Sequence, residues 1–214
     1  MGKLLLITRP EHDPGTRYLS RWSEKIINEA KNKGVRVIDL YRQQAERKRF
    51  LGTLKKSSPN LVVLNGHGNE KTVTGHDGQD ILTESDGCVV SGKIIFARAC
   101  RSAKILGPEL VARGVVVYLG YKEDFWFKYN IRDISRPLED RTAALFLEPS
   151  NYLVISLLKG HSAGEANKRS QELYKKSIGR LLAEGPLSED YDAIGLLFWD
   201  MINQVCLGNE NAVF

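Results

Sequence analysis

A histidine and a cysteine each follow an apolar run of the strand type. Leu61-Val-Val-Leu-Asn-Gly leads to His67, and Ile94-Ile-Phe-Ala-Arg-Ala leads to Cys100, 33 residues further along the chain. If the two runs are parallel neighbours in one sheet, their carboxyl ends lie at the same edge. A thiol nucleophile and the imidazole that takes its proton have to meet in this way. The spacing therefore predicts nucleophilic catalysis by Cys100, with His67 as the general base.

Small residues beside the pair fit the same chemistry. Gly68 leaves its backbone N–H unobstructed, and together with the N–H of Cys100 it could form an oxyanion hole. Cys100 also precedes a predicted helix at residues 103–113, whose positive end would lower the pKa of the thiol. Taken singly, a free cysteine is more often a small buried hydrophobe, and a strand-end histidine is more often structural. Their joint appearance favours catalysis.

Composition narrows the alternatives. The chain has 214 residues, 42% of them apolar and 27% charged, as in an ordinary globular protein. No apolar stretch approaches the length of a membrane span, and Leu4–Ile7 is too short for a secretory signal, so a cytoplasmic location without membrane association is expected. Three cysteines in a chain of this length predict no disulfide framework, and Cys88 and Cys206 are interpreted as incidental thiols. No cysteine or histidine pair has metal-ligand spacing, so neither a metal nor a cofactor is expected.

The net charge of +5 comes with a cluster of Lys and Arg at residues 42–56. A solvated helix face is the favoured interpretation of this cluster. Binding to nucleic acid is the weaker alternative, because the chain contains no recognised nucleic-acid motif.

Strand and helix signals alternate over the first part of the chain. Strands are expected at 3–8, 35–40, 61–64, 93–97 and 115–119, and helices at 17–33, 43–56 and 103–113. Strands that are apolar throughout indicate a parallel sheet covered on both faces. The predicted fold class is therefore α/β: a three-layer α/β/α sandwich with a mainly parallel sheet and a helical C-terminal part.

The remaining segments complete a single domain over residues 1–214. The glycine-rich stretch 69–91 is expected to be a loop or small hairpin, and 122–137 is an irregular aromatic and charged stretch. Helices are expected at 138–158 and 162–183, while periodicity leaves 194–207 open between strand and helix. We divide the domain into a core sheet at about 1–121, a helical segment at about 137–185 and a closing element at about 191–208.

At these residues the chain resembles the caspase-like (clan CD) cysteine peptidases. His67-Gly68 and Ala99-Cys100 match the family's two strand-end motifs, and the resemblance implies a base, an oxyanion donor and a nucleophile there. The stretch 115–124, Val-Val-Val-Tyr-Leu-Gly-Tyr-Lys-Glu-Asp, and the stretch 157–166 are most similar to the CHAT and separase branch. The match to apoptotic caspases is poorer, because Ser102 replaces the signature glycine and the His–Cys spacing is shorter.

The resemblance implies two opposite substrate preferences. Arg98, two positions before the nucleophile, would select an acidic residue before the cleaved bond. Asp124, with Glu123 beside it, would select a basic residue, and this is the preference we lean to. A third reading is that Arg98 and Asp124 pair with each other, because an unpaired buried charge is costly. His76 and Asp77 could contact substrate or orient His67, although a structural role is favoured for both.

The resemblance therefore implies a cysteine endopeptidase that forms an acyl-enzyme on Cys100. Its partners would be a protein or peptide substrate and, in one reading, a regulatory protein. The competing hypothesis is a catalytically silent scaffold or protein-interaction module with the same fold. Both reactive residues are present in the chain, which argues against that alternative.

Overall fold

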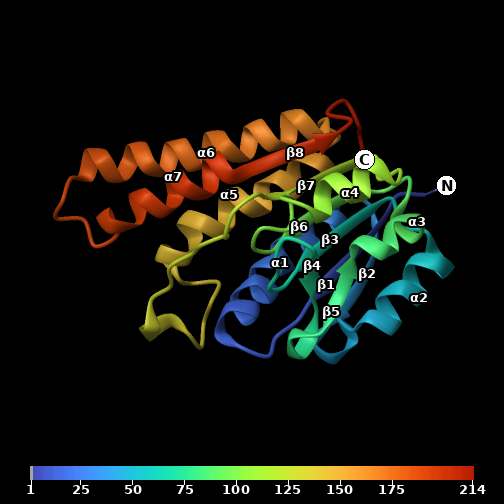
Figure 1. Cartoon of the computed structure of the whole chain (residues 1–214). Coiled ribbons are helices and arrows are strands. Elements are labelled where there is room, and N and C mark those ends of the chain that lie inside the picture. Colours follow the sequence, from blue (N-terminus) through green and yellow to red (C-terminus); the bar gives the residue numbers. More distant parts are fainter. Residues whose placement is uncertain (1) are drawn as a thin grey trace.

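A mainly parallel six-stranded sheet runs through the computed structural model, which describes residues 2–214 (Figure 1). Its strands are β1 (Leu4–Arg9), β2 (Arg36–Tyr41), β3 (Leu61–Asn65), β6 (Ile94–Arg98), β7 (Val117–Tyr121) and β8 (Gln204–Gly208). They lie in the order β2-β1-β3-β6-β7-β8, and β8 runs antiparallel to β7. The five parallel strands therefore end at one edge of the sheet.

Both faces of this sheet are covered by helices. The longer helices are α1 (Pro14–Asn32), α2 (Arg47–Ser57), α4 (Leu106–Ala112), α5 (Arg141–Leu158), α6 (Ala163–Glu184) and α7 (Ile194–Asn203); α3 (Gly87–Val90) is a single turn. One apolar core joins the sheet to α1, α5, α6 and α7, and the other joins it to α2, α3 and α4. Alternate residues of each strand point into alternate cores, which is why β1, β3, β6 and β7 are buried and apolar almost throughout.

The expected fold class is confirmed: the chain is a three-layer α/β/α sandwich with a mainly parallel sheet. The stretch 69–91 contains a small antiparallel pair, β4 (Thr72–Thr74) and β5 (Asp80–Thr83), in agreement with the predicted hairpin. Five short 3-10 turns complete the chain: η1 (Arg42–Gln44), η2 (His76–Gly78), η3 (Glu84–Asp86), η4 (Ile131–Asp133) and η5 (Tyr191–Ala193). None of the helices in residues 2–214 is both long and apolar enough to cross a membrane.

The ambiguous C-terminal segment is helix and strand in succession. Its first part forms α7, which packs beside α6, and its second part forms β8 at the end of the sheet next to β7 (Figure 1). Periodicity alone could not separate them, because α7 exposes several apolar side chains and β8 is a short edge strand. The sheet therefore receives its sixth strand from the closing segment rather than from residues 1–121.

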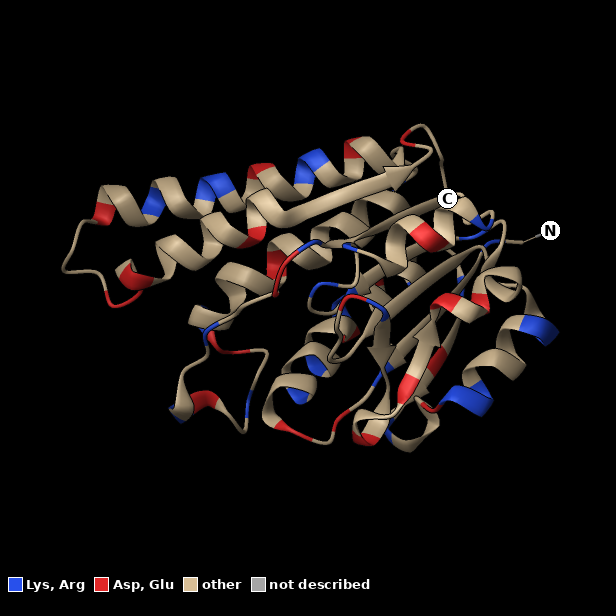
Figure 2. Ribbon diagram, in the orientation of Figure 1, with Lys and Arg blue, Asp and Glu red and all other residues tan. Residues whose placement is uncertain are grey.

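The basic residues at 42–56 lie mostly on the outer side of α2 (Figure 2). Arg47 is an exception, because it forms a bidentate ion pair with the buried carboxylate of Asp86 and ties α2 to the turn that follows β5. Lys48, Arg49, Lys55 and Lys56 are exposed. This arrangement fits a solvated helix face with one structural arginine.

Candidate active site

The residues predicted to do chemistry lie beyond the carboxyl ends of the central strands. The parallel register of β3 and β6 pairs Asn65 with Arg98, so His67 and Cys100, each two residues further on, lie at the same level. Both line one small cavity of about 90 Å³, together with Gly66, Phe125 and Phe127. The fold therefore brings the two side chains to a common space, as parallel neighbouring strands require.

Cys100 is partly buried and stands at the beginning of an irregular turn. Its Sγ lies 3.8 Å from the carbonyl oxygen of Phe125, which accepts the weak S–H hydrogen bond. Burial raises the pKa of the thiol above its ordinary value, and the carboxylates of Asp124 and Asp200 push it in the same direction. The surroundings of Cys100 therefore disfavour the thiolate form.

The expected helix dipole does not act on Cys100. The helix that follows, α4, begins at Leu106, and the intervening residues form turns with a left-handed Arg101. The influence of a helix dipole fades within its first turn. The prediction that Cys100 directly precedes a helix N-terminus is therefore wrong, and the sequence misplaced the start because residues 103–105 have helix-compatible side chains. The N-terminus of α4 therefore does not stabilise the thiolate form of Cys100.

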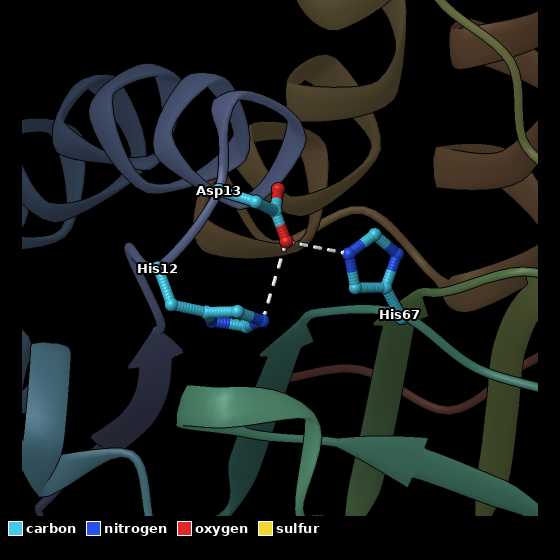
Figure 3. A group of neighbouring side chains, drawn as sticks. All are labelled: His12, Asp13 and His67. Atoms are coloured by element: carbon cyan, nitrogen blue, oxygen red, sulfur yellow. Dashed lines mark hydrogen bonds and ion pairs between the residues drawn. The ribbon is translucent and has the colours of Figure 1, made fainter.

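His67 is held by a carboxylate that sequence reasoning missed. Its Nε2 lies 2.7 Å from Oδ2 of Asp13, which comes from the loop after β1 (Figure 3). The other carboxylate oxygen, Oδ1, accepts the backbone N–H of Thr16 at 2.8 Å, because Asp13 is the N-cap of α1. One side chain therefore both starts a helix and orients the imidazole.

The contact with Asp13 determines which nitrogen of His67 can act as a base. Burial pushes the pKa of Asp13 upward, but the hydrogen bonds from Thr16 and His67 outweigh it and lower the pKa overall. An ionised carboxylate only accepts hydrogen bonds, so Nε2 carries the proton and Nδ1 keeps the free lone pair. In this tautomer Nδ1 is the atom of His67 that can take a proton from a thiol.

The sequence contains signals that mark Asp13 as the residue before a helix. Asp13 is followed by Pro14, and the N-cap and the first helical position are where these two residues are favoured. The capping box with Thr16 completes the signature. The apolar pattern predicts a start at residue 17, whereas the helix starts at Pro14, so the pattern alone does not mark Asp13 as the cap. Even a correct helix start would not have shown that Asp13 reaches His67.

Glycines beside His67 are required by close packing. A Cβ at Gly68 would lie 2.9 Å from both the Cβ of Ala99 and the carbonyl oxygen of Cys100. A Cβ at Gly66 would collide with the carbonyl oxygen of Thr74 in the hairpin. Gly68 therefore lets the His67 loop lie directly on the Cys100 loop, and Gly66 lets it lie against the hairpin. The packing also places the backbone of Gly68 beside that of Cys100.

The proposed pairing between Arg98 and Asp124 is wrong. Arg98 is fully buried and donates from Nη2 to Oδ1 of Asn151, while burial lowers its pKa to about 10. Asp124 instead forms an ion pair with Arg101, with Oδ1 3.0 Å from Nε, and both side chains are about 40% exposed. The two candidate pocket residues therefore lie in different surroundings: Arg98 is in the core, whereas Asp124 is at the surface.

The remaining predicted site residues lie around this centre. The carbonyl of Glu123 accepts the N–H of Arg101, and its carboxylate is 3.9 Å from Nζ of Lys104. In the hairpin, Nδ1 of His76 accepts the N–H of Glu11, and Asp77 is largely exposed. His76 therefore supports the loop that carries Asp13, while its Nε2 lies 3.5 Å from Asp77 and its backbone N–H donates to the carbonyl of Ala45.

This combination of a six-stranded α/β/α sandwich and a strand-end His and Cys is a caspase-like fold. No family model matches the chain, and no curated protein matches it in sequence. Among solved structures, the crystal structure of the Arg-specific cysteine proteinase gingipain R is similar over the whole chain, with a TM-score of 0.65 and 15% identity. A complex of the pro- and mature domains of RgpB from Porphyromonas gingivalis matches with a TM-score of 0.61 and 14% identity over 99% of the chain.

The chain spans about half the length of those two structures, 47% and 48% of them. At such identities the likeness shows the shared fold. The roles of individual residues have to be argued from this chain's own geometry.

Proposed function

We propose that the protein is a cysteine peptidase that cleaves peptide bonds through an acyl-enzyme on Cys100. The proposal is carried by one observation: His67 and Cys100 line the same small cavity, and a carboxylate fixes the tautomer of His67. The similarity in fold to a cysteine proteinase, gingipain R, supports it. The competing scaffold hypothesis gives no reason for Asp13 to orient His67.

In the proposed mechanism, Nδ1 of His67 takes the proton of the Cys100 thiol as Sγ attacks the scissile carbonyl carbon. The N–H groups of Gly68 and Cys100 would donate to the oxyanion that forms. His67, now an imidazolium stabilised by Asp13, then returns the proton to the leaving amine. Water hydrolyses the thioester and regenerates the thiol, with His67 again as the base.

For substrate specificity, the surroundings of the two candidate residues favour a basic residue before the cleaved bond. Arg98 lines the cavity of Cys100, but its side chain is fully buried and its Nη2 is bonded to Asn151, so an acidic side chain would have to displace the residues packed around it. Asp124 is at the surface, and its backbone carbonyl accepts from Nε1 of Trp199 at 3.0 Å. The next residue, Phe125, accepts the hydrogen bond of the Cys100 thiol, so Asp124 adjoins a residue that contacts the proposed nucleophile. Gingipain R is Arg-specific, which supports the same preference.

Arg101 occupies the carboxylate of Asp124 in the free protein. Since both partners are about 40% exposed, this ion pair contributes at most about 1 kcal/mol. A substrate arginine could therefore replace the guanidinium of Arg101 at little cost. The alternative partner of a substrate arginine is the carboxylate of Glu123, which lies beside Asp124 and is also partly exposed.

The test uses acyloxymethyl ketone probes that differ only in their terminal residue: arginine, norleucine or aspartate. We expect labelling by the arginine probe, and loss of labelling in Cys100→Ala and His67→Ala. Two results would contradict the proposed nucleophile. One is labelling that persists in Cys100→Ala. The other is no labelling of the wild type by any probe, also when the experiment is repeated with Ca²⁺ and candidate partners.

Matched variants then locate the pocket. Asp124→Asn should remove the preference for arginine over norleucine, while Glu123→Gln should keep it. Arg101→Ala should increase the rate of labelling by the arginine probe by up to about fivefold, because it removes the competing guanidinium. If Glu123→Gln alone changes the preference, Glu123 is the pocket residue.

Three further features of the protein stay predictions from the sequence. Membership of the CHAT and separase branch is one of them, since the similar structures are those of gingipain R and its pro-domain complex. A cytoplasmic location is the second. The third is a regulatory protein partner, for which the complex of the pro- and mature domains of RgpB offers a precedent.

A further inference from the structure

Three groups capable of binding a metal converge beside the proposed catalytic base. Oδ2 of Asp13 lies 2.7 Å from Nε2 of His67 and 3.2 Å from Nε2 of His12 (Figure 3). The three ligand atoms lie within 4.8 Å of one another. The sequence predicted no metal site because His67 is 54 positions from Asp13, so the group exists only in the folded chain.

We propose that His12, Asp13 and His67 form a site for a divalent transition-metal ion of the zinc class. We also propose that an ion bound there stops proton transfer by His67. The second statement rests on the function proposed above, whereas the first does not.

The set of ligand atoms selects the class of ion. Two imidazole nitrogens and one carboxylate oxygen, with a water molecule in the fourth position, are ligands that zinc takes in open tetrahedral sites. Calcium and magnesium prefer sites made of oxygen ligands only. We therefore expect Zn²⁺, and Co²⁺ as its spectroscopic substitute, to bind, and Ca²⁺ not to bind.

The geometry is close to what such an ion needs. Zinc–ligand bonds of about 2.0–2.1 Å place tetrahedral ligand atoms about 3.3–3.4 Å apart. The distance from Asp13 to His12, 3.2 Å, is near this value, whereas the distance to His67, 2.7 Å, has to lengthen by about 0.6 Å to admit the ion. His67 can supply that movement, because 57% of its side chain is exposed. Asp13 is already oriented, since its second oxygen accepts the N–H of Thr16.

The site is expected to bind less tightly than a structural zinc site. The buried Nδ1 of His12 has no hydrogen-bond partner among the described residues. Ligating histidines usually donate from their second nitrogen, and losing such a partner costs about 10–100-fold in affinity. This is the behaviour of a reversible inhibitory site rather than one that holds the fold together.

Metal binding at this position would disable the base for a simple chemical reason. In the free protein, Nε2 of His67 carries a proton and donates it to Asp13. An ion at Nε2 takes that lone pair, so the neutral ring must carry its proton on Nδ1 instead. Nδ1 then has no lone pair for the proton of Cys100. No bond is oxidised or reduced in this change; the proton moves from one ring nitrogen to the other.

The binding test uses the whole chain with Cys100→Ala, which removes the thiol nearest to His67. Zn²⁺ is titrated against a chromophoric chelator, and Co²⁺ binding is followed by visible absorption. We expect one ion per chain with the absorption of a tetrahedral site. His12→Gln in the same background should weaken binding by at least about tenfold. The control is His161→Gln, which alters a histidine–carboxylate pair elsewhere, with Nδ1 3.1 Å from Glu165, and it should leave the affinity unchanged.

Several results would overturn the site. One is the absence of Zn²⁺ binding, and another is equal affinity in the His12→Gln and His161→Gln variants. Binding that the wild type shows but Cys100→Ala lacks would place the ion on Cys100 and His67, and would also contradict the proposal.

The inhibition test uses the protein with Cys100 intact. Zn²⁺ should slow probe labelling of Cys100, a chelator should restore it, and His12→Gln should be resistant to Zn²⁺ while labelled normally in chelator. Zn²⁺ binding without any effect on labelling would refute the inhibitory role. If Cys100 is never labelled even in chelator, the proposed peptidase activity fails, yet the binding result in the Cys100→Ala background still stands.

Discussion

Asp13 has two roles that two substitutions can separate. One carboxylate oxygen caps α1 through Thr16, and the other orients His67. Asparagine caps a helix as well as aspartate, whereas replacement by alanine costs about 1 kcal/mol. We therefore expect Asp13→Asn to keep the wild-type melting temperature. In a chain of this size, Asp13→Ala should lower it by about 2–4 °C.

Of the two variants, the more stable one, Asp13→Asn, should be the less active. Asparagine has one acceptor oxygen, and the N–H of Thr16 requires it, so the amide NH₂ faces Nε2 of His67. An NH₂ group donates to Nε2, which puts the ring proton on Nδ1, the atom that should act as the base. Alanine leaves the ring free to choose either tautomer. Asp13→Asn should therefore be the slower enzyme although it is the more stable protein.

The expected losses of rate in the two variants follow from the contacts of Asp13. A hydrogen bond to a charged group contributes about 1.5–3 kcal/mol, or about 10–100-fold in rate at 1.36 kcal/mol per tenfold. Asp13 keeps 31% of its side chain exposed, so the lower end applies and Asp13→Ala should lose about tenfold. The wrong tautomer costs about 10⁴-fold in a serine peptidase triad, which sets the upper limit for Asp13→Asn.

The assay measures the rate of labelling by the arginine probe as a function of probe concentration, together with thermal unfolding of each variant. Because Asp13 acts through His67, the maximal labelling rate should fall while the concentration for half-maximal rate stays unchanged. If Asp13→Ala is as slow as Asp13→Asn, or slower, the tautomer argument is refuted. A loss of rate in Asp13→Ala alone, with Asp13→Asn as fast as the wild type, would show that Asp13 acts only through the position of α1.

Three further outcomes are expected. Gly66→Ala should destabilise the fold by about 1–3 kcal/mol or more, because its Cβ would strike the carbonyl of Thr74. The control, Gly52→Ala, lies in α2 with open space around it and should stabilise the fold by up to about 1 kcal/mol. Equal effects of the two substitutions on thermal unfolding would contradict the packing at Gly66. Asp200 is fully buried, and burial raises its carboxyl pKa well above the ordinary value, so its ionisation destabilises the folded state as pH rises. Asp200→Asn should therefore raise the melting temperature at pH 8 and not at pH 4. An equal gain at both pH values would refute the effect of the buried charge. Burial raises the thiol pKa of Cys100, so alkylation by iodoacetamide should still be rising above pH 9, and a plateau at neutral pH by mass spectrometry would show an ordinary or activated thiol.

Much of the fold could be predicted because its signals are local. Strands buried on both faces have to be apolar throughout, and β1, β3 and β6 show this in their sequences. The closing segment, residues 194–207, could not be assigned from the sequence because its local pattern is unclear. α7 leaves Phe198 and Ile202 about half exposed, so its apolar residues do not form one buried helical stripe, and the change to β8 has no glycine or proline to mark it.

The sequence by itself determined that a histidine and a cysteine follow two buried strands, because strand type and position along the chain are encoded within a few residues. Only the tertiary structure decided what surrounds them. Asp13 reaches His67 across 54 residues, and Arg98 turns to Asn151 across 53. Such partners depend on how the crossover helices return each strand to the sheet, and no local pattern records that. The same folding that gives His67 its orienting carboxylate also brings His12 beside it, and so creates the proposed metal site.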